Sequence, residues 1–209
     1  SRSEVVDAIF QMISEILKDG HVSYVKWDMN RSITECWSAA LPADRQGEVF
    51  HRYILGVYNL YERLTSAFPH ILFESCSSGG ARFDPGLLYY APQAWTSDDT
   101  DAVERLKIQY GTSYCYPVSS MGAHVSACPN HQVGRITPLN TRANVACFGT
   151  FGYELDLNRL SSDELEEIKE QITFMKTWRN LLQFGTFYRL QSPFLGNIAS
   201  WMAVSDDHS

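Results

Sequence analysis

Residues 21–30 have the sequence HVSYVKWDMN, a short stretch that is rich in β-branched and aromatic side chains and ends on polar ones. Such a stretch is typical of a buried strand that emerges at a functional edge of a sheet. Before it, apolar side chains recur at helical spacing over residues 1–20, and we expect Gly20 to end this helix in a left-handed cap. A helix followed by a strand is thus the first repeat of the chain.

The alternation of helix and strand continues to the end of the chain. Helical spacing predicts helices at residues 49–68, after Asp101, at 139–147 and from Ser161 to about 184. Short apolar stretches predict strands at 70–75 (HILFES), 93–97 (QAWTS), 116–121 (YPVSSM) and 150–155. Two of the helices open with capping-box spacing, Asp101 with Glu104 and Ser161 with Glu164. The pattern argues for parallel strands, in a doubly wound sheet or in a (β/α)₈ barrel.

The ends of the strands decide between these two folds. The first three strands end in different polar clusters, KWDMNR (26–31), ESCSSGG (74–80) and WTSDDTD (95–101). Polar groups at several successive strand ends are typical of a barrel, whereas a doubly wound sheet concentrates its ligand groups at one switch point. Because about five strands can be counted, we expect residues 1–187 to form the C-terminal portion of a (β/α)₈ barrel that lacks its first three strands.

A different pattern follows Gly185. Apolar and polar residues alternate with period two, around a loop that contains Pro193, Gly196 and Asn197. This pattern predicts strands joined by a turn. We therefore expect residues 188–209 to begin an all-β C-terminal domain that is cut short at Ser209.

Composition excludes several classes of function. The 24 acidic and 17 basic residues give a net charge of −7, with no Lys/Arg cluster for phosphates or for an anionic membrane, so we expect neither nucleic acid nor a membrane as a partner. The N-terminal stretch carries acidic residues throughout and is neither a signal peptide nor a membrane span. Five widely spaced cysteines without a C-x-x-C pair fit free thiols in a reducing compartment.

Asp28 and Asp98 are the candidate catalytic residues by position. A retaining glycosidase places two carboxyl groups roughly 5 Å apart, one to attack the anomeric carbon and one to protonate the leaving oxygen. Asp28 and Asp98 end strands that are two units apart, and a barrel would point both into one crater. Lys26 shares the strand face of Asp28, where its charge would keep Asp28 ionised and its ammonium could donate to sugar hydroxyls. Trp27 would face the helix layer.

Each of these side chains also has a structural alternative. An Asp at a strand end often caps the next helix, and Asp101 suits that role best in the run SDDTD. Which of Asp98 and Asp99 points inward stays open, because a slip of one residue in a strand reverses every side chain. Trp95 could stack on a sugar face, although an aromatic residue at a strand end is as often part of the core.

The loop CSSGGARFD (76–84) and two histidines give weaker signals. Its paired glycines could bring backbone amides close to a ligand, but a tight strand-to-helix turn is the favoured explanation. Cys76 has no His or Asp in a position that would make it a nucleophile. His124 and His131 follow the fourth predicted strand without a third ligand of suitable spacing, so we expect structural groups and no metal site.

Four stretches resemble the bacterial α-galactosidases of glycoside hydrolase family 36, the melibiase and raffinose-hydrolysing enzymes: YVKWDMNRSITE, FESCSSGGARFDPG, WTSDDTDAVERLKIQYGTS and MGAHVSACPNHQVGR. The resemblance implies that Asp28 is the nucleophile and that Asp98, not Asp99, is the acid/base. It implies sugar contacts from Lys26, Asn30, Cys76 and Gly79, to which we add Trp95 and Arg82 as candidates. The family's paired aspartates and its sugar-binding Trp and Arg come from earlier strands that this chain does not contain.

The resemblance implies a retaining exo-α-galactosidase that removes terminal α-D-galactosyl groups from melibiose and raffinose-type α-1,6-galactosides. It implies no metal or organic cofactor, an α-galactoside oligosaccharide as substrate, a homotetramer for the full-length enzyme and a cytoplasmic location. Two alternatives stay open. Galactosyl transfer is a close variant of the reaction, and the chain as given could be a catalytically incompetent piece of a barrel whose exposed sheet edges and apolar faces favour aggregation.

Overall fold

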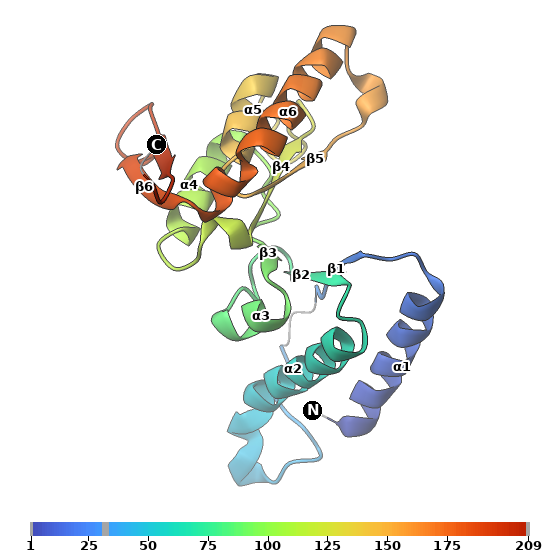
Figure 1. The fold of residues 1–209 in the computed structure, drawn as a ribbon. Helices are drawn as coiled ribbons and strands as arrows, with labels where there is room; N and C mark the ends of the chain where they lie inside the picture. The colour runs from blue at the N-terminus through green and yellow to red at the C-terminus, as the bar shows by residue number, and fades with distance from the viewer. Residues whose placement is uncertain (1, 31–33, 208–209) are drawn as a thin grey trace. The chain divides into compact units, whose positions relative to one another are not determined.

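The chain divides into two compact units, Ser1–Pro92 and Gln93–Ser209 (Figure 1). The computed structural model describes residues 2–30 and 34–207. Residue 31, the last of the first polar motif, lies outside the described residues, as do residues 32–33 and, at the ends of the two predicted domains, residues 1 and 208–209.

The first unit pairs two parallel strands that are separated in the chain by a long helix. Its elements are α1 (Ser3–Asp19), β1 (Tyr24–Asp28), the 3₁₀ helix η1 (Ala43–Glu48), α2 (Val49–Ala67), β2 (Leu72–Cys76) and α3 (Pro85–Tyr90). In the register of the two strands, Lys26 lies opposite Glu74 and Asp28 lies opposite Cys76. Parallel pairing requires a crossover, and α2 provides it. The helices and strands predicted in this region are confirmed, and η1 and α3 are additions.

The core of the first unit lies between β1, β2 and α2. Tyr61 and Leu64 of α2 and Phe73 of β2 are buried at its centre. The Tyr61 ring lies 5.1 Å from the ring of Trp27 and 5.9 Å from that of Phe73. Trp27 therefore faces the helices, as predicted, and the alternation of a strand places Lys26 and Asp28 on the other face.

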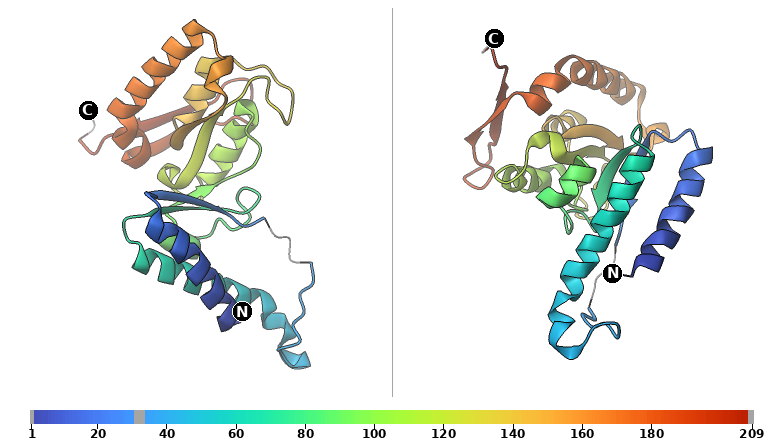
Figure 2. Two further views of the ribbon diagram at one scale, coloured as in Figure 1. Left: turned by 90° about the vertical axis from the view of Figure 1, so that its right-hand side faces the viewer. Right: turned by 60° about the horizontal axis from the view of Figure 1, so that its bottom comes forward.

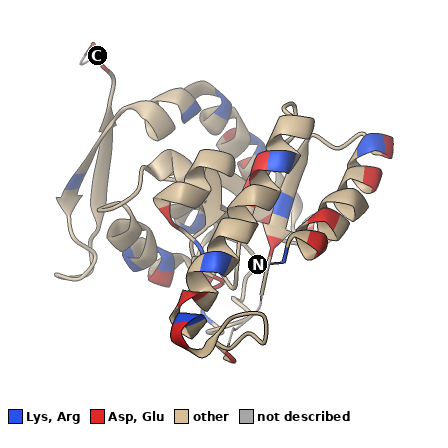
Figure 3. Ribbon diagram, turned by 90° about the horizontal axis from the view of Figure 1, so that it is seen from below, with Lys and Arg blue, Asp and Glu red and all other residues tan. Residues whose placement is uncertain are grey.

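α1 packs along α2 (Figure 2), where Val6 and Leu17 are buried, whereas Met12 and Ile16 of the same helix are exposed. The charged positions of both helices are coloured in Figure 3, and one pair crosses between them: Arg63 Nη1 lies 2.7 Å from Asp7 Oδ1. Both side chains of this pair are partly exposed, so we expect it to contribute less than about 1 kcal/mol. Apolar contact is the main term that holds α1 in place.

The predicted left-handed cap at Gly20 is wrong. Gly20 takes an extended conformation, with φ −90° and ψ 143°, while its N–H still donates to Ile16 O. Space is the reason for glycine at this position: a Cβ atom would lie 2.8 Å from Val22 Cγ2. The extended conformation leads the chain from α1 toward β1 without a turn.

The second unit carries three parallel strands and an antiparallel hairpin. Its elements are β3 (Gln93–Trp95), α4 (Ala102–Thr112), η2 (Val118–Ser120), β4 (Met121–Ser126), α5 (Leu139–Ala146), β5 (Thr150–Glu154), η3 (Leu157–Arg159), α6 (Ser162–Phe184), β6 (Thr186–Gln191) and β7 (Ser200–Val204). Trp95 lies opposite Gly122 across β3 and β4, and His124 lies opposite Gly152 across β4 and β5.

α5 and α6 cover the sheet of the second unit (Figure 2). Ala123 and Val125 of β4 are fully buried against Leu139, Ala143 and Ile168 of these helices. The capping box predicted for α6 is confirmed: Ser161 Oγ accepts the Glu164 backbone N–H over 3.2 Å, and Glu164 Oε2 accepts the Ser161 N–H over 2.9 Å.

The strand predicted at residues 116–121 is wrong for most of its length. Pro117 has no N–H for a strand ladder, and Ser120 Oγ donates to the Pro117 carbonyl over 2.7 Å, which closes the short helix η2. The strand β4 begins at Met121, where the predicted one ended. As a consequence, His124 lies within β4 and does not follow it.

β6 and β7 form the hairpin predicted after Gly185, in antiparallel register with Tyr188 opposite Met202. Phe148, which precedes β5, packs against Phe187 at 5.8 Å and against Trp201 at 5.3 Å between ring centroids. Arg189 Nε donates to Ser113 Oγ over 2.7 Å. The hairpin thus packs within the second unit, and its place at the start of a larger all-β domain stays a prediction.

The observed fold is mixed α/β. All strands before Gly185 in the described residues pair in parallel and alternate with helices. This arrangement is consistent with part of a (β/α)₈ barrel. In the stretches 2–30 and 34–207, no helix is both long and apolar enough to cross a membrane.

Candidate active site

The carboxyl ends of β1 and β2 gather the predicted site residues of the first unit. Lys26 and Asp28 project from one face of β1, and Cys76 ends β2 opposite Asp28. Asp28 and Lys26 are exposed, whereas Cys76 is buried. A parallel pair of strands ends at one edge, so the nucleophile candidate lies directly beside the loop that follows β2.

Asn30 links the Asp28 carboxylate to that loop. Asn30 Nδ2 donates to Asp28 Oδ2 over 2.7 Å. Asn30 Oδ1 accepts the backbone N–H of Ser78 and lies 3.3 Å from Ser78 Oγ. One side chain therefore uses both ends of its amide to fix a carboxylate oxygen relative to the glycine-rich loop.

The loop after β2 is a tight turn in the left-handed region. Ser78 has φ 47° and Gly79 has φ 75°, and the Ser77 N–H donates to Gly79 O over 3.0 Å. Glycine adopts such φ values at no steric cost, while a serine there is strained. The turn holds the Ser78 N–H toward Asn30, so the structure favours the turn explanation of the paired glycines and gives the turn a role in the site.

Cys76 is not a nucleophile in this environment. Burial raises the pKa of its thiol to about 11, which outweighs the lowering by the Gly79 backbone N–H, and the neighbouring Asp28 carboxylate raises it further. The thiol therefore stays protonated at neutral pH. It can line the site beside Asp28, as the resemblance implies.

Arg82 connects the same loop to the end of β1. Its Nη1 donates to the Met29 carbonyl and to Ser77 Oγ, and its Nη2 donates to Tyr53 Oη over 3.2 Å. Ser77 Oγ also donates to Met29 O over 3.0 Å. Arg82 thus braces the backbone beside Asp28, a role that the sequence did not indicate, and its predicted sugar contact stays a prediction.

Glu74 is a site residue that the sequence analysis missed. It lies on β2, two residues before Cys76, with 2% of its surface exposed. Its Oε2 accepts a hydrogen bond from Tyr24 Oη, and its Oε1 lies 3.8 Å from Lys26 Nζ. The signal was present in the motif FESC, because Glu74 is two residues before Cys76 and therefore shares its strand face.

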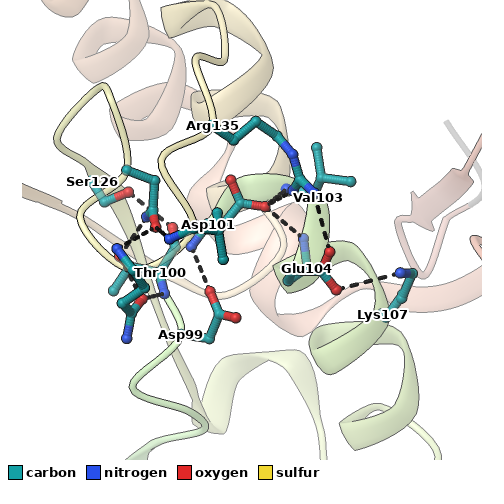
Figure 4. A network of polar contacts seen from close by, with 11 residues as sticks. Asp99, Thr100, Asp101, Val103, Glu104, Lys107, Ser126 and Arg135 are labelled. Carbon is teal, nitrogen blue, oxygen red and sulfur yellow. Dashed lines mark hydrogen bonds and ion pairs between the residues drawn. The ribbon is translucent and has the colours of Figure 1, made fainter.

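The second unit separates the roles of the three aspartates after β3, of which Figure 4 shows Asp99 and Asp101. Asp101 caps α4 by accepting the backbone N–H groups of Val103 and Glu104, each over 3.1 Å. Asp99 Oδ1 accepts the N–H of Asp101 over 3.0 Å. Within the described residues, the exposed Asp98 carboxylate has no hydrogen-bond partner. It is therefore the carboxylate of the three that remains available to a ligand.

The predicted capping box of α4 is only half formed. Glu104 does not return to the Asp101 N–H, which donates to Asp99 instead. Glu104 binds Lys107 at 3.3 Å and Arg135 at 3.3 Å, and both cations hold the pKa of Glu104 below its usual value. Arg135 also forms an ion pair with Asp101, so the cap is tied to the loop after β4.

A polar network fixes the backbone around Asp98, and Figure 4 shows the part of it around Thr100 and Ser126. Gln132 Oε1 accepts the Thr100 N–H over 2.8 Å, and Gln132 Nε2 donates to the Asp98 carbonyl. Asn130 Nδ2 donates to Thr100 Oγ1 over 3.0 Å, and Ser126 Oγ donates to Thr100 O over 2.8 Å. The strand end is therefore preorganised by the next strand and its loop.

Trp95 lies in the core, with 4% of its surface exposed. Its ring stacks on His124 at 4.5 Å between centroids, and the Arg105 guanidinium lies 4.4 Å from its centroid. Of the two alternatives that the sequence left open, this packing favours the core residue. Stacking of Trp95 on a sugar is not supported by its placement in this structure.

The two histidines are not arranged as metal ligands. His124 Nδ1 lies 3.5 Å from Glu154 Oε2, and His131 lies in the loop after β4. In the described parts of the chain, no group of three or more His, Cys, Asp or Glu side chains could hold a metal ion. His124 instead packs against Trp95 within the sheet.

Comparison with known proteins identifies the family. The Melibiase family profile matches residues 1–185. This chain belongs to the Melibiase family. It is 62% identical over 209 residues to α-galactosidase AgaA from Geobacillus stearothermophilus, a match that covers 100% of this chain and 29% of AgaA. The chain thus spans less than a third of the length of that relative.

Solved structures of the same relative share the fold of this Melibiase chain. A crystal structure of the GH36 α-galactosidase AgaA matches with a TM-score of 0.95 and 62% identity, over 99% of this chain and 29% of that one. A variant of AgaA in complex with raffinose matches with the same TM-score, at 61% identity and with the same coverage. The resemblance that the motifs indicated is confirmed at the level of family and fold.

Proposed function

We propose that the natural protein containing this chain is a retaining exo-α-galactosidase. It removes terminal non-reducing α-D-galactosyl groups from melibiose and raffinose-type α-1,6-galactosides. The observation that carries the proposal is that two carboxylates at strand ends, Asp28 and Asp98, lie in a chain that matches the Melibiase family over residues 1–185. The raffinose bound to an AgaA variant supports the substrate class.

In the first step, Asp28 is the nucleophile. A carboxylate oxygen of Asp28 forms a bond to the anomeric carbon, while the bond from that carbon to the leaving oxygen breaks and Asp98 gives its proton to that oxygen. The contact from Asn30 orients Asp28 for attack. A contact that fixes a reacting group contributes by lowering the entropy lost in reaching the transition state.

In the second step, the Asp98 carboxylate takes a proton from water as the water oxygen bonds to the anomeric carbon. The bond between that carbon and Asp28 breaks as the new bond forms, and the two displacements together retain the configuration. Transfer of the galactosyl group to another sugar is the same step with a hydroxyl in place of water. The two displacements need only these carboxyl groups and an acceptor, with no metal or organic cofactor.

The sugar contacts are proposed from the first unit. Lys26, Asn30, Cys76 and Gly79 lie beside Asp28 at the ends of β1 and β2. An ammonium, an amide and backbone N–H groups are suitable partners for sugar hydroxyls. A homotetramer and a cytoplasmic location are further proposals; the five free cysteines support the reducing compartment.

The test separates the two carboxylates by azide rescue in the natural protein. Wild type should release p-nitrophenol from p-nitrophenyl α-D-galactoside. Asp28→Ala, which lacks the nucleophile, and Asp98→Ala, which lacks the base of the second step, should each lose about 10²- to 10⁴-fold in steady-state turnover. Azide should restore turnover in both variants, giving β-galactosyl azide with Asp28→Ala and α-galactosyl azide with Asp98→Ala. No release by wild type would contradict the function, and the reverse azide products would contradict the roles.

A further inference from the structure

Glu74 is a buried carboxylate that the proposed chemistry does not use. It is among the largest fully buried side chains of the chain, although a carboxylate loses several kcal/mol of hydration when it is buried. Such a group is tolerated only with partners that compensate its charge. Its partners therefore indicate what the carboxylate does.

The two oxygens of Glu74 face two residues of β1. Oε2 accepts from Tyr24 Oη, and burial, followed by this bond, raises the pKa of the Tyr24 hydroxyl. Oε1 lies 3.8 Å from Lys26 Nζ. Tyr24 and Lys26 are two residues apart and so share a strand face, and from that face the carboxylate meets one neutral donor and one cation.

Lys26 has a second carboxylate within reach of its strand face. Asp28 lies two residues further along β1, about 7 Å away by the rise of a strand. The lysine stem has four flexible carbons, and its side chain is 37% exposed. Without the charge of Glu74, the ammonium would be drawn to Asp28, where an ion pair would weaken the carboxylate as a nucleophile.

We propose that Glu74 is a positioning residue, whose buried carboxylate holds the Lys26 ammonium in place to meet a sugar hydroxyl and away from the Asp28 carboxylate. Tyr24 fixes the rotamer of Glu74 in this arrangement. The inference rests on the proposed galactosidase function, because it assigns to Lys26 a ligand in that site.

The experiment is a double-mutant cycle in the natural protein containing this chain. Glu74→Gln keeps the shape of the side chain and an acceptor for Tyr24 but removes the charge. Lys26→Met removes the ammonium, and the double variant closes the cycle. Glu166→Gln is the matched control, because it removes one charge from an exposed Lys169–Glu166 pair on α6.

The readouts are kcat/KM for p-nitrophenyl α-D-galactoside and the Kd for free galactose by calorimetry. Glu74→Gln should lower kcat/KM about 10-fold and weaken galactose binding, but in the Lys26→Met background it should change kcat/KM less than about 2-fold. Tyr24→Phe should lose less than Glu74→Gln, since the charge remains. Glu166→Gln should behave as wild type.

Three results would overturn the inference. One is an equal loss from Glu74→Gln in the presence and absence of Lys26, since a purely structural role would lower activity in both backgrounds. The second is a loss with Tyr24→Phe as large as with Glu74→Gln. The third is a wild type without activity, which would remove the proposed function as well. The role of Glu74 alone would be overturned if the wild type is active, Asp28→Ala abolishes that activity, and the effects of Glu74→Gln and Lys26→Met are additive.

Discussion

Asn30 Nδ2 lies 2.7 Å from Asp28 Oδ2, and the opposite end of the same amide accepts the Ser78 N–H. The amide thus connects the end of β1 to the turn after β2. Arg82 braces the same junction by donating to the Met29 carbonyl. The orientation of the Asp28 carboxylate therefore depends on a residue of its own strand and on the turn after the neighbouring strand.

Replacing Asn30 by Ala should lower kcat/KM strongly and the free energy of unfolding only slightly. It removes a hydrogen bond to a charged group, which is worth about 1.5 to 3 kcal/mol, so we expect a loss of about 10- to 100-fold. Initial rates with p-nitrophenyl α-D-galactoside and a thermal melt of the same sample would measure both effects.

Ser78→Ala is the matched control for this change. It keeps the backbone N–H that Asn30 accepts and removes only the hydroxyl, which lies 3.3 Å from Asn30 Oδ1. We expect activity within about 3-fold of wild type, because the surviving bond is the shorter one. A larger loss with Ser78→Ala than with Asn30→Ala would show that the amide does not orient Asp28.

Asp98→Ala should affect catalysis, whereas Asp99→Ala should affect stability. If Asp98 protonates the leaving oxygen, Asp98→Ala should slow the hydrolysis of melibiose about 100-fold or more. Its effect on the first step with p-nitrophenyl α-D-galactoside should be much smaller, because that leaving group needs little protonation. Asp99→Ala should instead lower the stability by about 1 kcal/mol, because the Asp101 N–H loses its acceptor.

The ratio of the rates with p-nitrophenyl α-D-galactoside and with melibiose tests this prediction. Pre-steady-state release of p-nitrophenol isolates the first step, and glucose release from melibiose measures the natural linkage. If Asp99→Ala changes the ratio of the two rates and Asp98→Ala leaves it unchanged, then Asp98 is not the general acid. Differential scanning calorimetry would report the loss of the turn contact.

Periodicity was sufficient for most of the fold because most helices here are amphipathic and most strands are short and apolar. It failed at β4, whose residues Met121–Ser126 include small side chains that carry little strand signal, while the stretch before it, with Tyr116 and Val118, is interrupted by Pro117. It also failed at Gly20, where crowding by Val22 and not a positive φ requires glycine. Neither cause is visible as a period in the sequence.

The site was predictable where alternation along one strand was enough. Lys26, Trp27 and Asp28 occupy the faces that period two assigns to them. The contacts between strands were not predictable, because they depend on register: Glu74 meets Lys26 only because the two lie opposite each other. The brace from Arg82 to the Met29 carbonyl has no sequence signature, since a backbone acceptor carries no side-chain identity.

Two adjacent serines provide a sharp test of the α6 capping box. Ser161→Ala removes the acceptor for the Glu164 N–H and should destabilise the second unit by about 1 kcal/mol. Ser162→Ala is the matched control, since its hydroxyl contacts only Asp163 at 3.4 Å and it lies in the first turn of the helix. Urea melts followed by circular dichroism would measure both; equal midpoints for the two variants would contradict the cap.

Stability should fall at alkaline pH, with Cys147 as one cause. Burial raises the pKa of its thiol to about 11 from an ordinary value of 9.0. The folded state therefore binds this proton more tightly than the unfolded state, so its contribution is fully present below about pH 9 and is lost as the pH rises toward 11. After allowance for solvent screening, we expect the loss to be about 1 to 2 kcal/mol.

Calorimetric midpoints from pH 7.5 to 10.5 would test this linkage. Cys147→Ala should lower the midpoint at every pH, because it leaves a small cavity, but its midpoint should fall less steeply above pH 9 than that of wild type. Cys115→Ala is the control, because Cys115 is an exposed thiol of the same unit, and its slope should match wild type. Parallel slopes for all three proteins would show that the buried thiol does not titrate in this range. The alkaline loss would then have to come from tyrosines with a raised pKa, among them the half-buried Tyr153, whose pKa burial raises to about 12.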